Sequence, residues 1–209
     1  MKLFDFDGTL VDSNGVWEEI DIRFLERRGL TPTREYCETV GHSIFPIAAQ
    51  FTREYYHLDM EPQAIMDEWL SMAKDAYEHQ VPLKPGAAEY LEQCAAEGTP
   101  MALFTACVPE LCRAALDRHG LTKYFSRVIY VQEMGLEKRN PESFRLALEQ
   151  LGVPGSACTM YEDSPGACEA AKIAGLTVVG VYDRFYAAHE EKMRRLCDCY
   201  VYSFTELLA

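Results

Sequence analysis

The first thirteen residues, MKLFDFDGTLVDS (1–13), place two aspartates at the end of a short apolar run. The run from Lys2 to Phe6 predicts a buried strand, and Asp5 and Asp7 are followed at once by Gly8. Two like charges this close repel each other, and a carboxylate is rarely buried without a partner. Either the strand ends in solvent at this point, or a positive group holds the two carboxylates.

The segment after this strand predicts a helical insertion. Apolar residues recur at helical spacing from Val16 to Leu25, and Gly29 ends that pattern. Two further helical patterns are expected at about 43–57 and 62–78. We therefore expect residues 14–80 to form a helical domain.

The rest of the chain alternates between helical and strand patterns. This alternation predicts βαβ units and a parallel sheet. We therefore predict an α/β fold, with a Rossmann-like core formed by 1–13 and 81–209 and an α-helical cap, 14–80, inserted after the first strand. The expected strands are 100–104, 128–131, 158–161, 177–181 and 200–202, and the expected helices are about 86–97, 109–118, 141–151, 165–174 and 187–196.

Polar residues gather where the predicted strands end. Ligands of open parallel sheets bind at the carboxyl ends of the strands, so these residues are expected to share one edge. Carboxylates are ligands for hard cations such as Mg²⁺, and a hydroxyl and an ammonium suit phosphate oxygens. Gly8 allows a tight turn whose backbone N–H groups can face the same anion. The candidate site residues at these strand ends, with the backbone of Gly8 and Ala106 included, are Asp5, Asp7, Gly8, Thr9, Thr105, Ala106, Lys138, Glu162 and Asp163.

The order of these motifs resembles that of the haloacid dehalogenase (HAD) superfamily. The matching stretches are DFDGTLVDS, Thr105 after a central strand, Lys138 ahead of Asn-Pro-Glu-Ser-Phe, and EDSPGACEAAKIAG. The resemblance covers the whole chain. It is greatest to the branch of helical-cap phosphatases and beta-phosphoglucomutase.

The resemblance implies Mg²⁺-dependent hydrolysis of a small phosphomonoester metabolite. It implies that Asp5 is the nucleophile that forms an aspartyl-phosphate, and that Asp7 is the general acid and then the base. The implied metal ligands are Asp5, Asp7, Glu162 and Asp163. The implied phosphate contacts are Gly8, Thr9, Thr105, Ala106 and Lys138, of which Thr105 and Lys138 also offset charge in the transition state.

Two alternatives to a phosphatase stay open. The first is a phosphomutase of the beta-phosphoglucomutase type, which shares the intermediate. Against it, Trp17 stands where the mutase has a histidine, and the loop Gly41-His42-Ser43-Ile44 lacks the mutase's arginine. The second is a non-catalytic protein that binds a phosphorylated metabolite. Asp7 argues against dehalogenase chemistry, because true dehalogenases of the superfamily lack this aspartate.

The cap is expected to select the substrate. His42 lies in a loop between predicted cap helices and is our main candidate for substrate contact, with Trp17 as a second. Trp17 also fits the alternative of a core residue of the cap. A surface histidine is the corresponding alternative for His42.

Composition excludes several classes of partner. The net charge is −13, which argues against a nucleic-acid partner. No apolar run approaches the roughly 20 residues that span a bilayer, and the N-terminus does not resemble a signal peptide. We therefore expect a cytoplasmic protein, a monomer or weak dimer, with its eight cysteines reduced.

Overall fold

The computed structural model describes residues 1–40 and 45–209, which form two compact units. One unit consists of Met1–Ser13 with Val81–Ala209 and contains a parallel sheet; the other, Asn14–Gln80, contains helices. The predicted fold class, an α/β parallel-sheet core with an inserted helical domain, is confirmed.

The sheet has six strands in the order β3-β2-β1-β4-β5-β6, and every pairing is parallel. The chain proceeds from β1 outward to β2 and β3, then returns to the far side of β1 for β4. The sheet therefore has a topological switch between β1 and β4, which is where open α/β sheets bind ligands. The strands are β1 (Lys2–Phe4), β2 (Met101–Thr105), β3 (Val128–Tyr130), β4 (Thr159–Glu162), β5 (Thr177–Val181) and β6 (Cys199–Val201).

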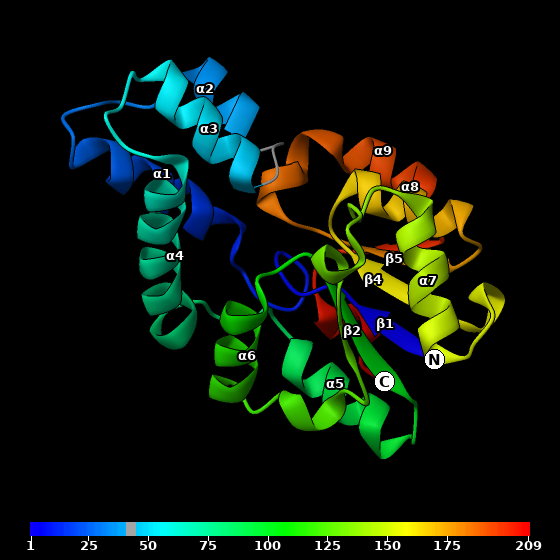
Figure 1. Cartoon of the computed structure of the whole chain (residues 1–209). Helices are drawn as coiled ribbons and strands as arrows, with labels where there is room; N and C mark the ends of the chain where they lie inside the picture. Colours follow the sequence, from blue (N-terminus) through cyan, green and yellow to red (C-terminus); the bar gives the residue numbers. More distant parts are fainter. Residues whose placement is uncertain (41–44) are drawn as a thin grey trace. The chain divides into compact units, whose positions relative to one another are not determined.

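Helices cover both faces of the sheet, because alternate strand residues point to opposite sides. Leu3 and Phe104 face one core layer, which includes Phe144, Cys168 and Met193 from the helices that follow β3, β4 and β5. On the other face, Phe4 stacks on Tyr161 and packs against Tyr90 and Phe204. Figure 1 shows α7, α8 and α9 on one side of the strands and α5 on the other.

Prolines begin three of the core helices. Pro109, Pro141 and Pro165 each occupy the first helical turn, where the missing N–H costs nothing. The Asn140 side chain accepts a hydrogen bond from the Glu142 N–H and so caps one of them. The core helices are α5 (Ala87–Ala96), α6 (Pro109–Arg118), α7 (Pro141–Leu151), α8 (Pro165–Ile173) and α9 (Glu190–Leu196).

The helical unit is held together by aromatic side chains. Trp69 packs against Phe24 and Phe45, with ring centroids 5.6 and 5.5 Å apart. The Tyr36 hydroxyl is buried and donates a hydrogen bond of 2.6 Å to Asp21. The helices of this unit are α1 (Asn14–Glu26), α2 (Arg34–Val40), α3 (Phe45–Tyr55) and α4 (Pro62–His79). Among the described residues, no helix is long and apolar enough to cross a membrane.

Two local expectations differ from the structure. The first strand ends at Phe4, so that Asp5 lies just beyond the sheet. The helix expected at 187–196 begins as a 3₁₀ helix, Arg184–His189, before α9. The Asp183 carboxylate accepts a hydrogen bond from the Phe185 N–H, which starts this tighter turn three residues before the apolar pattern predicts a helix.

We predict that Gly86→Ala destabilises the protein more than Gly98→Ala does. Both glycines flank α5 with positive φ, 78° and 68°. A Cβ on Gly86 would lie 2.5 Å from the Thr205 nitrogen, whereas no described atom lies within 4 Å of one on Gly98. Both changes carry the cost of a left-handed alanine, and overpacking adds about 1–3 kcal/mol at Gly86 alone. Urea unfolding of the two variants measures the difference, and equal losses would contradict the proposed close approach.

Candidate active site

The switch between β1 and β4 brings two carboxylates together. Phe4 pairs with Tyr161 across these strands, and the Asp5 N–H donates to the Tyr161 carbonyl at 3.0 Å. Asp5 therefore leaves β1 beside Glu162, the last residue of β4. Both residues are buried, so their charges require a partner.

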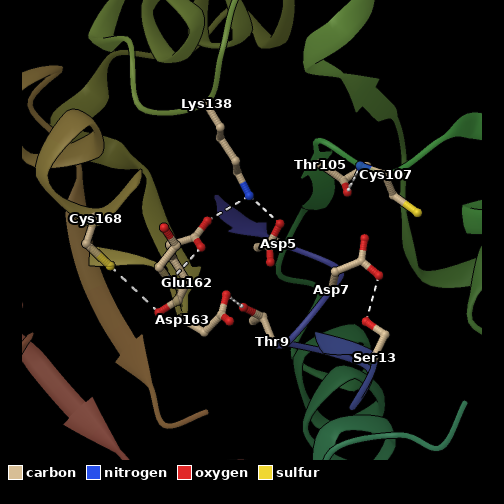
Figure 2. A network of polar contacts seen from close by, with 11 residues as sticks. Asp5, Asp7, Thr9, Ser13, Thr105, Cys107, Lys138, Glu162, Asp163 and Cys168 are labelled. Atoms are coloured by element: carbon tan, nitrogen blue, oxygen red, sulfur yellow. Dashed lines mark hydrogen bonds and ion pairs between the residues drawn. The ribbon is translucent and has the colours of Figure 1, made fainter. Parts of the chain in front are cut away.

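Lys138 supplies that partner. It lies in the segment between the 3₁₀ helix Val131–Met134 and α7, and its ammonium reaches between the two carboxylates (Figure 2). The Lys138 Nζ donates to Asp5 Oδ1 and lies 2.7 Å from Glu162 Oε2. All three side chains are nearly excluded from solvent, so these ion pairs are weakly screened.

Asp163 completes an acidic cluster with Asp5 and Glu162. Carboxylate oxygens of the three residues lie within 4.8 Å of one another. The Thr9 hydroxyl is buried and donates to Asp163 Oδ1 at 3.2 Å. The Ser164 N–H donates to Glu162 Oε1 at 2.9 Å, which fixes this carboxylate at the start of α8.

Burial and mutual repulsion control the charges of the cluster. Burial, followed by the Glu162 charge, raises the pKa of Asp5 to about 7, although Lys138 opposes this. The same two causes raise the pKa of Asp163 well above its usual range. Burial alone would lower the pKa of Lys138, but the charges of Asp5 and Glu162 outweigh it and raise that pKa. Lys138 therefore stays protonated and provides one positive charge against three carboxylates.

Asp7 lies two residues beyond Asp5, and its carboxylate contacts Ser13, whereas Lys138 contacts Asp5 and Glu162 (Figure 2). Asp7 is half-buried, and its Oδ1 accepts a hydrogen bond of 2.7 Å from the Ser13 hydroxyl. Gly8 has a φ of 77°, and its N–H donates to the Val11 carbonyl at 2.8 Å. The two aspartates thus have different hydrogen-bond partners, Lys138 for Asp5 and Ser13 for Asp7.

The residues after β2 form a second side of the site. Thr105 is buried at the end of β2, and its Oγ1 accepts a hydrogen bond of 2.9 Å from the Cys107 N–H. Thr105 does not cap α6, whose N-cap is Val108. Ala106 is exposed between them. The buried Cys107 thiol lies beside Asp7, and burial followed by the Asp7 charge raises its pKa well above its usual range.

The acidic cluster fits a divalent cation. Three carboxyl groups face one ammonium in a buried place, so a second positive charge would favour their ionised forms, and hard oxygen donors of this kind suit Mg²⁺ or a similar ion. The residues that could hold it are Asp5, Glu162 and Asp163.

The two cap candidates differ in what the structure says of them. His42 lies outside the described residues. Trp17 is half-buried within the helical unit, donates through Nε1 to the Tyr77 hydroxyl at 3.2 Å, and packs edge-on against Phe45. These contacts agree with the alternative that Trp17 is a core residue of the helical domain.

Sequence reasoning missed two residues beside Asp7. Ser13 and Cys107 were not singled out, although both belong to stretches that were, DFDGTLVDS and the residues following Thr105. Their spacing from Asp7 in the sequence does not indicate contact. The one signal for them is their place close in sequence to Asp7 and Thr105, within stretches that already carry candidate residues.

Comparisons with known proteins identify the family. Residues 2–181 match the profile of the haloacid dehalogenase-like hydrolases, and the chain belongs to this family. The phosphorylated carbohydrates phosphatase of Thermotoga maritima is 29% identical over 181 residues, 83% of this chain and 81% of that protein. The protein CbbY of Cereibacter sphaeroides is 36% identical over 215 residues, 90% of this chain and 86% of that protein.

A solved structure agrees in fold. The crystal structure of CbbY from Rhodobacter sphaeroides in complex with phosphate has a TM-score of 0.81 and 26% identity, and the match covers 99% of this chain and 95% of that one. The predicted family is thus confirmed. Relatives named as phosphatases agree with the predicted class of enzyme, a phosphoric monoester hydrolase.

We predict that the free energy of unfolding of Asp5→Asn increases relative to that of wild type as the pH rises from about 4 to 7, when both proteins are free of metal. The Asp5 pKa is raised from 3.8 to about 7, so its contribution to stability is present at low pH and is lost as the pH rises through 7. Asparagine does not titrate, so the difference in free energy of unfolding between the variant and wild type should grow by at most about 1.4 kcal/mol for each pH unit between the two pKa values. Urea unfolding in EDTA at several pH values measures it.

Asp12→Asn, an exposed change in the same loop, controls for the loss of one charge. A difference between wild type and Asp5→Asn that stays constant or shrinks with rising pH would show that Lys138 keeps Asp5 ionised throughout.

Proposed function

We propose that the protein is a Mg²⁺-dependent phosphatase of small phosphorylated carbohydrates. The observation that carries the proposal is the Lys138 ammonium between Asp5 and Glu162, at the end of the two strands that flank the topological switch. This arrangement holds one carboxylate beside a fixed positive charge, where a phosphoryl group can be bound and attacked. Relatives named for phosphorylated carbohydrates and for fructose-1-phosphate support the substrate class.

Asp5 is the proposed nucleophile. One of its oxygens forms a bond to phosphorus, the bond from phosphorus to the leaving alcohol oxygen breaks, and an aspartyl-phosphate results. Water then attacks phosphorus and releases inorganic phosphate and the free carboxylate. Lys138 has two roles here, since it favours the ionised form of Asp5 and offsets negative charge on the phosphoryl oxygens.

Asp7 is the proposed general acid and base. It gives a proton to the leaving alcohol and later takes one from the attacking water. Ser13 donates to Asp7 Oδ1 and so orients the carboxyl group. Asp5 and Asp7 contact different partners, Lys138 and Ser13, so the two aspartates can take different roles in one site.

The remaining residues bind and orient. Asp5, Glu162 and Asp163, with the Asp7 backbone, would hold Mg²⁺, which supplies positive charge to the phosphoryl oxygens when bound. Gly8, Thr9 and Ala106 are proposed to line the phosphate site together with Thr105. Thr9 acts in part through Asp163, to which its hydroxyl is bonded.

The test is release of inorganic phosphate from a panel of hexose, pentulose and hexitol phosphates, with Mg²⁺ and with EDTA. We expect metal-dependent release from one or a few members of the panel. Conversion of a sugar monophosphate into an isomer without net phosphate release, and dependent on a bisphosphate, would identify a phosphomutase instead. Binding without either reaction would identify a non-catalytic protein.

We predict that Asp5→Asn lowers kcat by at least about a thousandfold, as removal of a nucleophile does in other enzymes with a covalent intermediate. Asp7→Asn should lower it by roughly 10²–10⁴-fold, the usual contribution of an acid–base group. The exposed Asp12→Asn change in the same loop should leave kcat within about twofold of wild type. Circular dichroism checks the fold of each variant. Turnover retained by a folded Asp5→Asn protein would exclude Asp5 as the nucleophile.

A further inference from the structure

Two thiols meet directly behind the acidic cluster. Cys168 is buried on α8, and its Sγ lies 3.7 Å from the backbone carbonyl of Glu162, to which it donates (Figure 2). Cys197 lies between α9 and β6 and is partly exposed. It packs against the same core layer that contains Cys168.

The register of the sheet places the two sulfur atoms over the same pair of residues. Glu162 of β4 is paired with Gly180 of β5. A Cβ on Gly180 would lie only 2.9 Å from the Cys197 Sγ, so the absence of a side chain at Gly180 makes room for this sulfur. Since Cys168 contacts the carbonyl of Glu162, both thiols lie at one rung of the sheet, close enough to influence each other.

The two thiols have different chemical character. The neighbouring Cys168 thiol lowers the pKa of the Cys197 thiol, in spite of partial burial. Cys168, in contrast, is buried. A partly exposed thiol of lowered pKa beside a second thiol is the arrangement found where cysteines are oxidised reversibly.

We propose that Cys168 and Cys197 are an oxidisable pair that a hydroperoxide converts into a disulfide. The Cys197 thiolate attacks the peroxide, the O–O bond breaks, and Cys197 becomes a sulfenic acid as the peroxide is reduced to water or an alcohol. The Cys168 sulfur then displaces the sulfenic oxygen as water, and an S–S bond forms. Two thiols are oxidised and one peroxide is reduced, so the atoms and electrons balance.

The disulfide would weaken metal binding at the acidic cluster, a consequence that rests on the proposed function. Oxidised Cys168 can no longer donate to the Glu162 carbonyl, and Glu162 and Asp163 directly precede α8. Loss of a contact that orients a metal-binding residue costs roughly tenfold or more in metal affinity. We therefore expect an affinity for Mg²⁺ about tenfold lower in the oxidised protein.

Mapping of the cross-link tests the thiol pair. Full-length protein is treated with hydrogen peroxide, free thiols are alkylated, and tryptic peptides are analysed by fragmentation mass spectrometry. The expected product joins residues 146–172 to 196–209 through Cys168 and Cys197, rather than through Cys158 or Cys199, which lie in the same peptides. Cys199→Ser, a change at the exposed neighbour, should retain the cross-link, and Cys197→Ser should lose it. A cross-link that persists in Cys197→Ser, or none in wild type, would overturn the proposal.

Calorimetric titration with Mg²⁺ tests the consequence on reduced, oxidised and dithiothreitol-treated protein. The expected result is a weaker Kd after oxidation that dithiothreitol reverses and that Cys197→Ser does not show. An unchanged Kd in cross-linked protein would overturn the link to the acidic cluster. Absence of Mg²⁺ binding by the reduced protein would contradict the proposed function, while the peptide map would still decide whether the pair forms a disulfide.

Discussion

A single buried ammonium allows the acidic end of the sheet to exist. Asp5, Glu162 and Asp163 are brought together by the pairing of β1 with β4, and without a counter-charge their burial would be strongly unfavourable. Lys138 pairs with two of the three from a segment more than a hundred residues from Asp5. It offsets only part of the charge. Burial and then the Glu162 charge raise the pKa of Asp5, and the cluster has the oxygen donors that suit a divalent cation.

The same arrangement separates the tasks of the two aspartates that open the sequence. Asp5 lies against Lys138 in a dry environment, whereas Asp7 is half-buried just before the turn at Gly8 and accepts a hydrogen bond from Ser13. A pair of like residues placed in unlike surroundings is what acid–base chemistry with a covalent intermediate requires. The central strand thus positions the proposed nucleophile, and the turn after it positions the proposed acid.

Much of the core could be predicted from the sequence. The alternation of helix and strand patterns gave the parallel sheet, and the rule that strand ends share an edge brought Asp5, Lys138, Glu162 and Asp163 to one place. Contacts such as Thr9 with Asp163, or Cys168 with Cys197, could not be predicted, because they depend on the order and register of β4, β5 and β6. Trp17 illustrates a different limit, since an aromatic residue at helical spacing favours a domain core but does not exclude a substrate contact until its neighbours are known.

The central claim is that Lys138 holds Asp5 ready to accept a phosphoryl group. The most direct measurement is a crystal structure of the protein with Mg²⁺ and beryllium fluoride, which mimics a phosphoryl group on a carboxylate. We predict a beryllium atom bonded to an Asp5 oxygen, Lys138 in contact with a fluorine, and Mg²⁺ between this group and Asp163. Beryllium fluoride bonded to another residue, or bound to Asp5 without contact to Lys138, would contradict the account.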